Sequence, residues 1–203
     1  KVAEKLSFIY VDTGAMYRAI GLYMWRSEVG VEDGTAVEDA CKNVDVTIEY
    51  EDGEQQVLLN GDNVNDYIRN ELVGELTSKI STYPVVRNKL LELERDMAKK
   101  GDVLMDGRDI GTNVLPEADL KIYLTADVKV RAQRRYLELQ RKGVESDIKE
   151  IEEDIMERDL RDMQRKIAPL KKAEDAIELN TSKLDINEVV DVVIDLVQEK
   201  RKA

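Results

Sequence analysis

The run from Val103 to Thr112 constrains this chain most, because it joins an apolar segment to a loop rich in glycine and charge. Val103-Leu104-Met105 is bounded by turn-forming residues, which predicts a short buried strand of a parallel sheet. Ligands bind beyond the carboxyl ends of such strands, where Gly107 permits a sharp turn. Arg108 offers a fork of donors that fits phosphate, and Asp109 can orient that fork or accept from a ligand amine. A plain strand-to-loop turn with a surface ion pair is the alternative.

A second apolar run, Phe8-Ile9-Tyr10-Val11, has the same organisation. Its β-prone residues predict another buried strand, with Asp12-Thr13-Gly14 at the carboxyl end. We expect Thr13 to cap the helix that follows, and a plain N-cap is the simplest role for it. Arg18 lies about one turn into that helix, close enough to its positive end to meet an anion.

The remaining pattern predicts an α/β chain that is interrupted once. Residues 46–50 alternate, Asp52-Gly53 is a hairpin signal and residues 56–59 return, so a small antiparallel sheet is expected there. Asp185 and Glu188 have the spacing of a capping box, ahead of an apolar stripe from 186 to 197 that predicts a core-facing helix. The other expected elements are helices at 35–43, 66–80, 127–142 and 146–165, a helix that Pro84 opens and Gly101 ends, and strands at 120–124 and 176–179; Ala168-Pro169 is expected to end the charged helix.

Several charged residues of these helices have ordinary surface roles on spacing alone. Arg87 lies off the apolar stripe of its helix, which is typical of a solvated arginine. Arg158, Asp162 and Arg165 are at i, i+4 and i+7 and therefore share one helical face. A solvated helix with ion pairs from Asp154 to Arg158 and from Arg158 to Asp162 is the simplest interpretation of that segment alone.

Composition excludes several classes of function. The chain has 203 residues, a net charge of -12 and no histidine. The negative charge argues against a nucleic-acid partner held by phosphate contacts, and the lack of histidine excludes Ser-His triads and His metal sites. The single cysteine, Cys41, excludes an internal disulfide and favours a reducing compartment, here the cytoplasm. No apolar run approaches the roughly 18 residues of a membrane span, so no membrane partner is expected.

Three motifs in this order resemble the bacterial cytidylate kinase family. They are Tyr10-Val11-Asp12-Thr13-Gly14-Ala15-Met16-Tyr17-Arg18, Asp106-Gly107-Arg108-Asp109-Ile110-Gly111-Thr112, and Glu157-Arg158-Asp159 through Arg165 to Ala168-Pro169-Leu170. The resemblance covers essentially the whole chain. It implies a P-loop kinase-type α/β fold, with a parallel sheet flanked by helices, a small antiparallel nucleotide-binding insert and a helical lid. We accordingly expect a core at 1–36, 84–143 and 168–203, a monophosphate-binding insert at 37–83 and a lid at 144–167.

The resemblance also implies an activity, transfer of the γ-phosphoryl group of ATP to CMP or dCMP with Mg²⁺, by a monomer. Thr13, Arg18, Arg108, Arg158 and Arg165 would then surround the CMP phosphate and the transferring group, with Gly107 beside them. Arg108, Arg158 and Arg165 would be catalytic. Asp162 and Arg158 would approach the sugar, and Ser78, Arg87 and Asp109 would read cytosine. Arg134 would border the adenine of ATP, and the residues that hold the metal stay unassigned.

One departure from the family pattern concerns the donor phosphates. The G-x-x-x-x-G-K-[ST] loop of the family does not occur in residues 1–203, and Lys1–Leu6 has the character of the end of a helix. We therefore expect the true sequence to extend upstream of Lys1. Three alternatives stay open: a nucleoside monophosphate kinase of another base specificity such as the UMP/CMP type, a nucleotide-binding protein without catalysis, and a charged helical scaffold.

Overall fold

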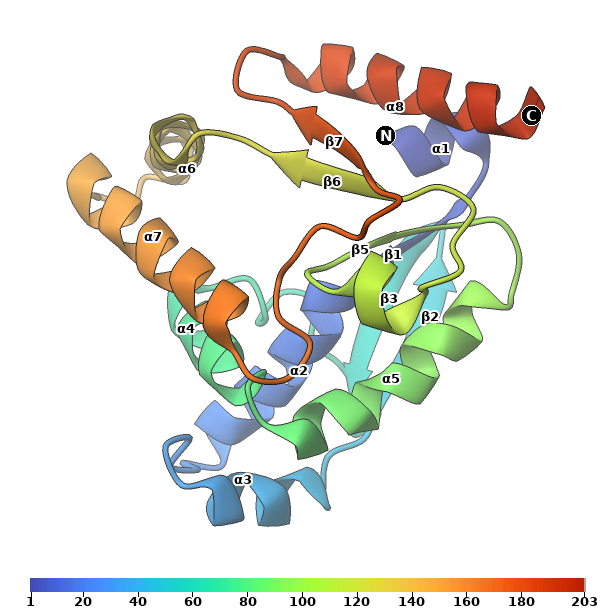
Figure 1. The fold of residues 1–203 in the computed structure, drawn as a ribbon. Coiled ribbons are helices and arrows are strands. Elements are labelled where there is room, and N and C mark those ends of the chain that lie inside the picture. The colour runs from blue at the N-terminus through green and yellow to red at the C-terminus, as the bar shows by residue number, and fades with distance from the viewer. Residues whose placement is uncertain (203) are drawn as a thin grey trace.

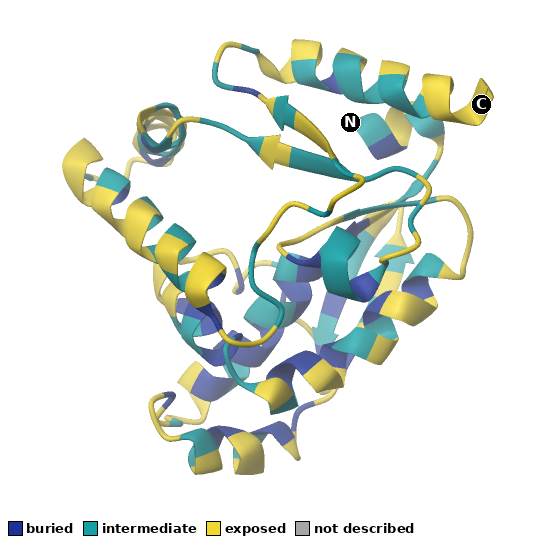
Figure 2. Ribbon diagram, viewed as in Figure 1, coloured by how far each residue is buried: buried dark blue, intermediate teal, exposed yellow. Residues whose placement is uncertain are grey.

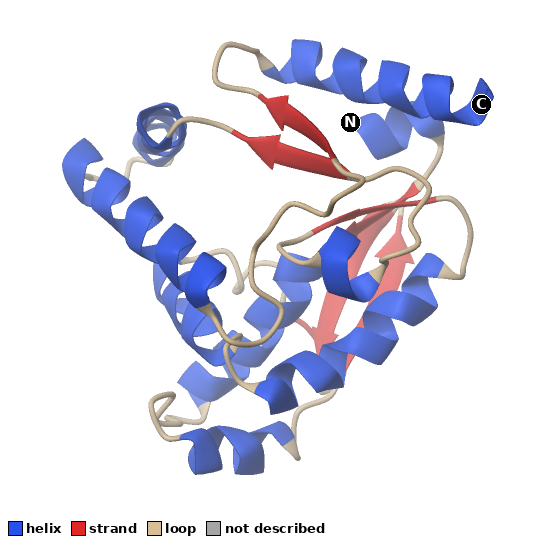
Figure 3. Ribbon diagram, viewed as in Figure 1, coloured by secondary structure: helices blue, strands red, loops and turns tan. Residues whose placement is uncertain are grey.

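The structure is a computed structural model and describes residues 1–202 as an α/β arrangement with parallel strands flanked by helices (Figures 1 and 3). This is the fold class that the sequence predicts. In chain order the elements are α1 (Val2–Leu6), β1 (Ile9–Asp12), α2 (Thr13–Arg26), α3 (Gly34–Cys41), β2 (Val46–Glu51), β3 (Glu54–Leu59), β4 (Asp62–Asn63), α4 (Glu71–Ile80), α5 (Pro84–Ala98), β5 (Val103–Asp106), the π-helical turn η1 (Ile110–Val114), β6 (Ile122–Thr125), α6 (Val128–Arg141), α7 (Ile148–Gln164), β7 (Ile177–Asn180) and α8 (Ile186–Lys202).

Two parallel strand pairs set the geometry of the fold. β1 pairs with β5 so that Asp12 lies opposite Asp106, and β6 pairs with β7 so that Thr125 lies opposite Asn180. Parallel strands that end in register bring their following loops together. The loop after β5 and the start of α2 therefore meet at one edge of the sheet.

The hairpin expected near residues 46–59 forms β2 and β3, which pair antiparallel, and β4 adds a third short strand. This sheet is tied to β1. The Tyr50 hydroxyl donates to the Tyr10 carbonyl, and the Gln55 side chain bonds both the N–H and the carbonyl of Asp12. The division of the chain into a core, an insert and a lid stays a prediction.

One hydrophobic core joins α2, α4, α5 and the antiparallel sheet (Figure 2). Burying the apolar stripe of α5 against α2 follows the predicted spacing, since Val86, Leu90 and Met97 are all buried. The side chains that the core excludes from water most completely include Met16, Ile20, Ile80, Leu90 and Met97. This core fixes the amino-terminal end of α2, which carries Thr13 and Arg18.

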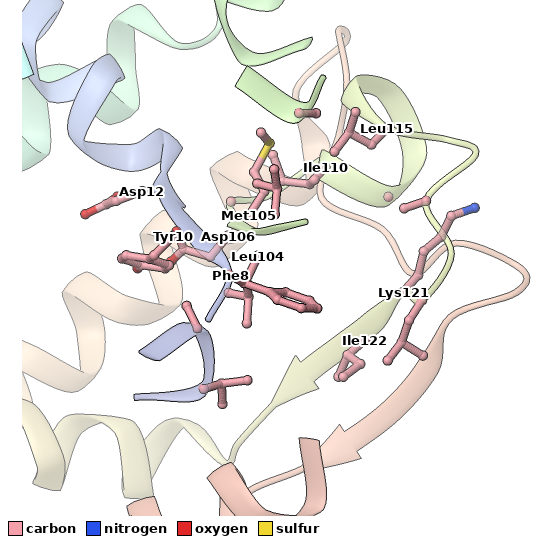
Figure 4. A pocket seen from close by; sticks show the side chains of 18 of the residues that line it. Phe8, Tyr10, Asp12, Leu104, Met105, Asp106, Ile110, Leu115, Lys121 and Ile122 are labelled. Atoms are coloured by element: carbon pink, nitrogen blue, oxygen red, sulfur yellow. The ribbon is translucent and has the colours of Figure 1, made fainter. Parts of the chain in front are cut away.

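The expectation of buried parallel strands is only partly correct. An open cavity of about 2220 Å³ separates β5 from β6, and Leu104, Met105 and Ile122 line it (Figure 4). Since the strands border this cavity, Tyr10 of β1 remains 40% exposed and β5 is only partly buried. The apolar stripe of α8 lines the same cavity. Within this stripe Val190 is buried, whereas Ile186 remains exposed.

Element boundaries differ from the prediction at two helix ends. α4 begins at Glu71 rather than near residue 66, because Asn70 supplies the N-cap by accepting from the N–H of Val73. α7 ends at Gln164, four residues before the expected Ala168, and Arg165 is its C-cap. The capping box is confirmed, since Asp185 and Glu188 exchange side-chain to backbone hydrogen bonds. No helix within residues 1–202 combines the length and apolar character needed to cross a membrane.

Candidate active site

The site forms where the loop after β5 meets the start of α2. Asp12, not Thr13, caps α2, because its Oδ1 accepts from the N–H of Ala15. Thr13 instead donates its hydroxyl to the Asp106 carbonyl at 2.7 Å, which ties the two strand ends together. A Cβ added at Gly107 would lie 2.6 Å from the Thr13 hydroxyl, so only glycine fits at this crossing. The predicted capping role of Thr13 is therefore wrong.

Three arginines from separate elements converge beside this crossing. Arg18 comes from α2, Arg108 from the loop after β5 and Arg158 from α7. Burial lowers the pKa of Arg18 and of Arg158, and the positive charge of Arg108 lowers both further. The Nε of Arg158 is buried and has no hydrogen-bond partner among residues 1–202. Buried polar groups ordinarily have partners. A cluster of cations with an unsatisfied donor is an environment that an anion such as phosphate would stabilise.

Asp109 is the centre of a second, buried network. Its Oδ2 accepts from Arg87 at 2.5 Å and from Asn113 at 3.0 Å, and its Oδ1 accepts from Arg165 at 3.2 Å. The side chains of Arg87, Arg165 and Asp109 are 6%, 3% and 7% exposed. Asp109 does not orient Arg108, whose partner is Asp162 at 3.1 Å. That part of the sequence prediction is wrong.

The surface role predicted for Arg87 from spacing is also wrong. Its guanidinium lies over the Tyr17 ring at 5.5 Å from the centroid, and it donates to the Ser81 carbonyl and to Asp109. Arg87 lies off the apolar stripe of α5 and is buried by its own contacts, which helical spacing does not reveal. Ser78 is buried on α4, where its hydroxyl accepts from Arg161 of α7 at 2.9 Å.

The ion pairs expected along α7 are replaced by pairs to other elements. Asp162 is buried and pairs with Arg108, and its other oxygen lies 3.7 Å from Arg165. Asp159 pairs with Arg131 of α6 at 2.5 Å. The expected ion pairs of Arg158 with Asp154 and Asp162 are not formed within residues 1–202, and the Arg158 Nε is left without a partner there. The face of α7 that carries these residues is directed toward the loop after β5, so the solvated-helix interpretation is wrong.

Comparison with known proteins assigns the family. The family model described as cytidylate kinase matches residues 1–199. The chain is 48% identical over 201 residues to a cytidylate kinase of Lactobacillus gasseri, which covers 99% of this chain and 87% of the relative. It is 43% identical over 199 residues to one of Geobacillus sp. and 44% identical over 199 residues to one of Carboxydothermus hydrogenoformans, with 98% of the chain covered and 89% and 90% of the relatives.

The chain belongs to the cytidylate kinase family. The resemblance drawn from the three sequence motifs is thereby confirmed. The roles assigned to single residues are a separate matter. Nine of the eleven expected site residues lie in the two clusters or in contact with them. Ser78 instead contacts Arg161 of α7, and Arg134 lies elsewhere, donating to the Thr181 and Leu184 carbonyls.

Sequence reasoning missed several polar residues of this cytidylate kinase family member. Asn113 contacts Asp109, Arg161 contacts Ser78, and Arg69 pairs with Asp12 at 2.9 Å. Asn113 lies four residues after Asp109, a spacing that signals contact only in a helix, and no helix was expected there. The contacts of Arg161 and Arg69 join residues 83 and 57 positions apart, which no local pattern reveals.

The ends of β1 and β5 also carry two carboxylates, Asp12 and Asp106, close to Arg18 of the arginine cluster. Asp106 borders the cavity, and its desolvation together with the charge of Asp12 raises its pKa to about 6 (Figure 4). Asp12 is occupied by the Ala15 N–H and by Arg69. Within residues 1–202 no group of three or more metal-ligating side chains is present. One carboxylate at a strand end suits a metal that would be held mainly by nucleotide phosphates.

Glu94 of α5 is the most unusual titratable group behind the site. It is 1% exposed, and its Oε2 has no hydrogen-bond partner. Desolvation and the nearby charge of Asp109 raise its pKa from 4.5 to about 8. Tyr17 faces the same buried region, and burial with the charge of Glu94 raises the Tyr17 pKa as well.

We predict that Glu94 makes the stability of the protein depend on pH. Between its unfolded pKa of 4.5 and its folded pKa of about 8, the folded chain holds a proton that the unfolded chain has released. The free energy of unfolding therefore falls as the pH rises through this range. Glu94→Gln is expected to raise the unfolding free energy by on the order of a few kcal/mol above about pH 8, and to have little effect below about pH 5.

Urea denaturation of the parent and of Glu94→Gln across this pH range measures the effect. Glu92→Gln is the matched control, because Glu92 is exposed on the same helix. A Glu94→Gln stabilisation that is constant with pH would contradict the assignment.

Proposed function

We propose that the two clusters are the acceptor site of this cytidylate kinase family member, an ATP-dependent (d)CMP kinase that transfers the γ-phosphoryl group of ATP to CMP or dCMP. The observation that carries the proposal is the convergence of Arg18, Arg108 and Arg158, with one of their donors buried and unpaired. The acceptor phosphate would occupy this cluster. The reaction attaches a phosphoryl group to an existing phosphate, so it needs charge stabilisation and little proton transfer.

The buried network around Asp109 is proposed to read cytosine. An ionised carboxylate has about four acceptor positions, and the three contacts to Asp109 leave one of them free, on Oδ1. That position would accept from the exocyclic amine of cytosine. The Ser78 hydroxyl accepts from Arg161 and keeps its own proton for a base acceptor. Arg87 would hold the remaining edge of the base.

Asp162 and Arg158 are proposed to lie beside the sugar. Asp162 is buried between Arg108 and Arg165, so it links the phosphate cluster to the base network. Thr13 and Gly107 would form the floor of the phosphate position, because their contact joins α2 to the loop after β5. Arg108, Arg158 and Arg165 would stabilise the charge that is shared between donor and acceptor phosphates during transfer.

The donor side rests on fewer contacts. Kinases of this kind use a divalent metal with ATP, and we propose that the metal is Mg²⁺ and that Asp106 would help to hold it. When bound, the ion would supply positive charge that offsets the negative charge of the donor phosphates. Arg134 is proposed to border the adenine, near the carboxyl ends of β6 and β7.

The proposed lid, residues 144–167, carries Arg158 and Asp162 one turn apart on α7 and Arg165 at the C-cap of that helix. Moving this segment would open and close the site, and closure would exclude the water that competes with CMP as acceptor. We further propose that the protein acts as a cytoplasmic monomer without a nucleic-acid partner. The net charge of -12 supports the lack of a nucleic-acid partner.

Arg18→Gln is expected to separate phosphate binding from base binding. Arg18 is close to Arg108, and no carboxylate in the described part of the chain forms a short ion pair with it, so its charge should act mainly on a bound phosphate. We predict that Arg18→Gln weakens CMP binding about tenfold to a hundredfold and leaves cytidine binding unchanged.

Calorimetric titration with CMP and with cytidine tests this. Arg26→Gln is the matched control, because Arg26 is exposed at the far end of α2 and lies over Tyr67. Equal losses for CMP and cytidine would show that Arg18 supports the fold of the site and does not bind the phosphate.

A further inference from the structure

The π-helical turn η1 follows Asp109 directly and controls where its neighbours point. The Asp109 carbonyl accepts from the N–H groups of Asn113 at 2.9 Å and Val114 at 3.3 Å, which closes a turn wider than that of an α-helix. Isolated π-helical turns are costly and occur often at functional sites. The turn brings the Asn113 side chain back to Asp109, where its Nδ2 donates to Oδ2 at 3.0 Å.

The same helix that supplies Arg87 also fixes this turn. Arg95 of α5 donates from Nη2 to the Asn113 carbonyl at 3.0 Å and from Nε to the Val114 carbonyl at 3.2 Å. Arg87 and Arg95 are therefore two anchors of one rigid element, one on the Asp109 side chain and one on the turn that follows it. Asn113 is held in place from its backbone, independently of its contact to Asp109.

As a result, the two carboxylate oxygens of Asp109 accept different numbers of hydrogen bonds. Oδ2 accepts from Arg87 and Asn113, which fills both of its acceptor positions, whereas Oδ1 accepts from Arg165 alone. Without the amide of Asn113, a position on each oxygen would be free and a ligand donor would have two places to bind. A carboxylate with a single free position presents a ligand amine with one geometry.

We propose that Asn113 is a specificity-determining positioning residue, which fills the second acceptor position of Asp109 Oδ2 and so directs the cytosine amine to Oδ1. The inference rests on the proposed role of Asp109 as the reader of cytosine. Asn113 acts through Asp109 and does not itself contact the nucleotide. Its contribution belongs to the binding of the base, so it should affect KM and base choice more than kcat.

Asn113→Leu tests the proposal, because leucine has the same branching at Cγ and no donor. We expect the KM for CMP to rise about tenfold with kcat little changed, and the CMP-over-UMP preference to fall by about the same factor, as for a lost hydrogen bond to a charged acceptor. Thr112→Val is the matched control. Its hydroxyl donates to the Asp109 backbone carbonyl in the same turn and does not contact the carboxylate, so the preference should stay at the parent value.

Asn113→Asp provides a second variant of nearly identical shape. It places a carboxylate against Asp109 Oδ2, and like charges at this distance repel. We expect a larger loss of CMP preference than with leucine. If Asp109→Asn lowers the preference while both Asn113 variants retain the parent value, the inference on Asn113 is wrong and the role of Asp109 stands. If Asp109→Asn also leaves the preference unchanged, the proposed function of the Asp109 network is wrong, and the inference with it.

Discussion

Replacing Arg158 with methionine is expected to lower kcat/KM for CMP about 10²- to 10³-fold without loss of stability. Its Nε is buried and unpaired, and burial beside Arg18 and Arg108 lowers its pKa. Such a charge is unfavourable in the ligand-free protein, so its removal should leave the unfolding free energy unchanged or raise it. A replacement that lowers activity without lowering stability is what we expect for a charged residue that binds a ligand.

The assay of ADP release with CMP, together with urea denaturation, measures both quantities. The rates of the parent and of Arg158→Met are compared in the catalytically active enzyme, with Mg²⁺ and ATP present. Lys149→Met is the matched control, since Lys149 is an exposed cation on the same helix and should leave the rate unchanged. A stability loss that accounts for the rate loss would show that Arg158 is a structural residue. Arg165→Met should reduce the rate similarly, but with a stability cost, because Arg165 pairs with Asp109 in the interior.

Asp109→Asn is expected to abolish most of the preference for CMP over UMP. Cytosine presents an amine where uracil presents a carbonyl, and a carboxylate can accept only from the amine. Facing uracil, the free position on Asp109 Oδ1 would stay unpaired in a buried site. Such a site can reject the wrong analogue by as much as roughly 10⁴-fold. Asparagine has both a donor and an acceptor, so it can bond either base.

The measurement is kcat/KM for CMP and for UMP in the parent and in the variant. Asparagine keeps the volume and one acceptor for Arg87 and Arg165, whereas Asp109→Ala would leave two buried arginines without a carboxylate and lose stability. Asp12→Asn is not a suitable control because Asp12 holds Arg69 and caps α2. Glu117→Gln, an exposed carboxyl in the segment between η1 and β6, should leave the ratio unchanged. A ratio that stays fixed in Asp109→Asn would identify another residue as the reader of cytosine.

Sequence patterns correctly predicted the elements whose stabilising contacts join residues close in sequence. The hairpin at β2 and β3, the buried stripe of α5 and the capping box of α8 each depend on residues close in sequence. The burial of β1 and β5 was overestimated because it depends on the space between β5 and β6, which no local pattern reports. The capping error at Thr13 has a similar origin, since its hydroxyl bonds to Asp106, 93 positions away.

The site was predicted more from resemblance than from spacing. Spacing alone favoured surface roles for Arg87 and for the face of α7, and both are wrong because Asp109 and Arg108 provide partners from distant parts of the chain. The three motifs contain residues that the structure brings together, but the motifs do not reveal which residues pair with one another. The pairing of Asp109 with Arg87 and Arg165, and of Arg108 with Asp162, is information that only the three-dimensional arrangement contains.

The central claim is that the arginine cluster binds the phosphate of CMP while Asp109 binds its base. A crystal structure of the protein with CMP tests it most directly. We predict the phosphate among Arg18, Arg108 and Arg158, and the exocyclic amine at about 3 Å from Asp109 Oδ1. A phosphate bound elsewhere, or a cytosine ring whose amine has no contact with Asp109, would contradict the account.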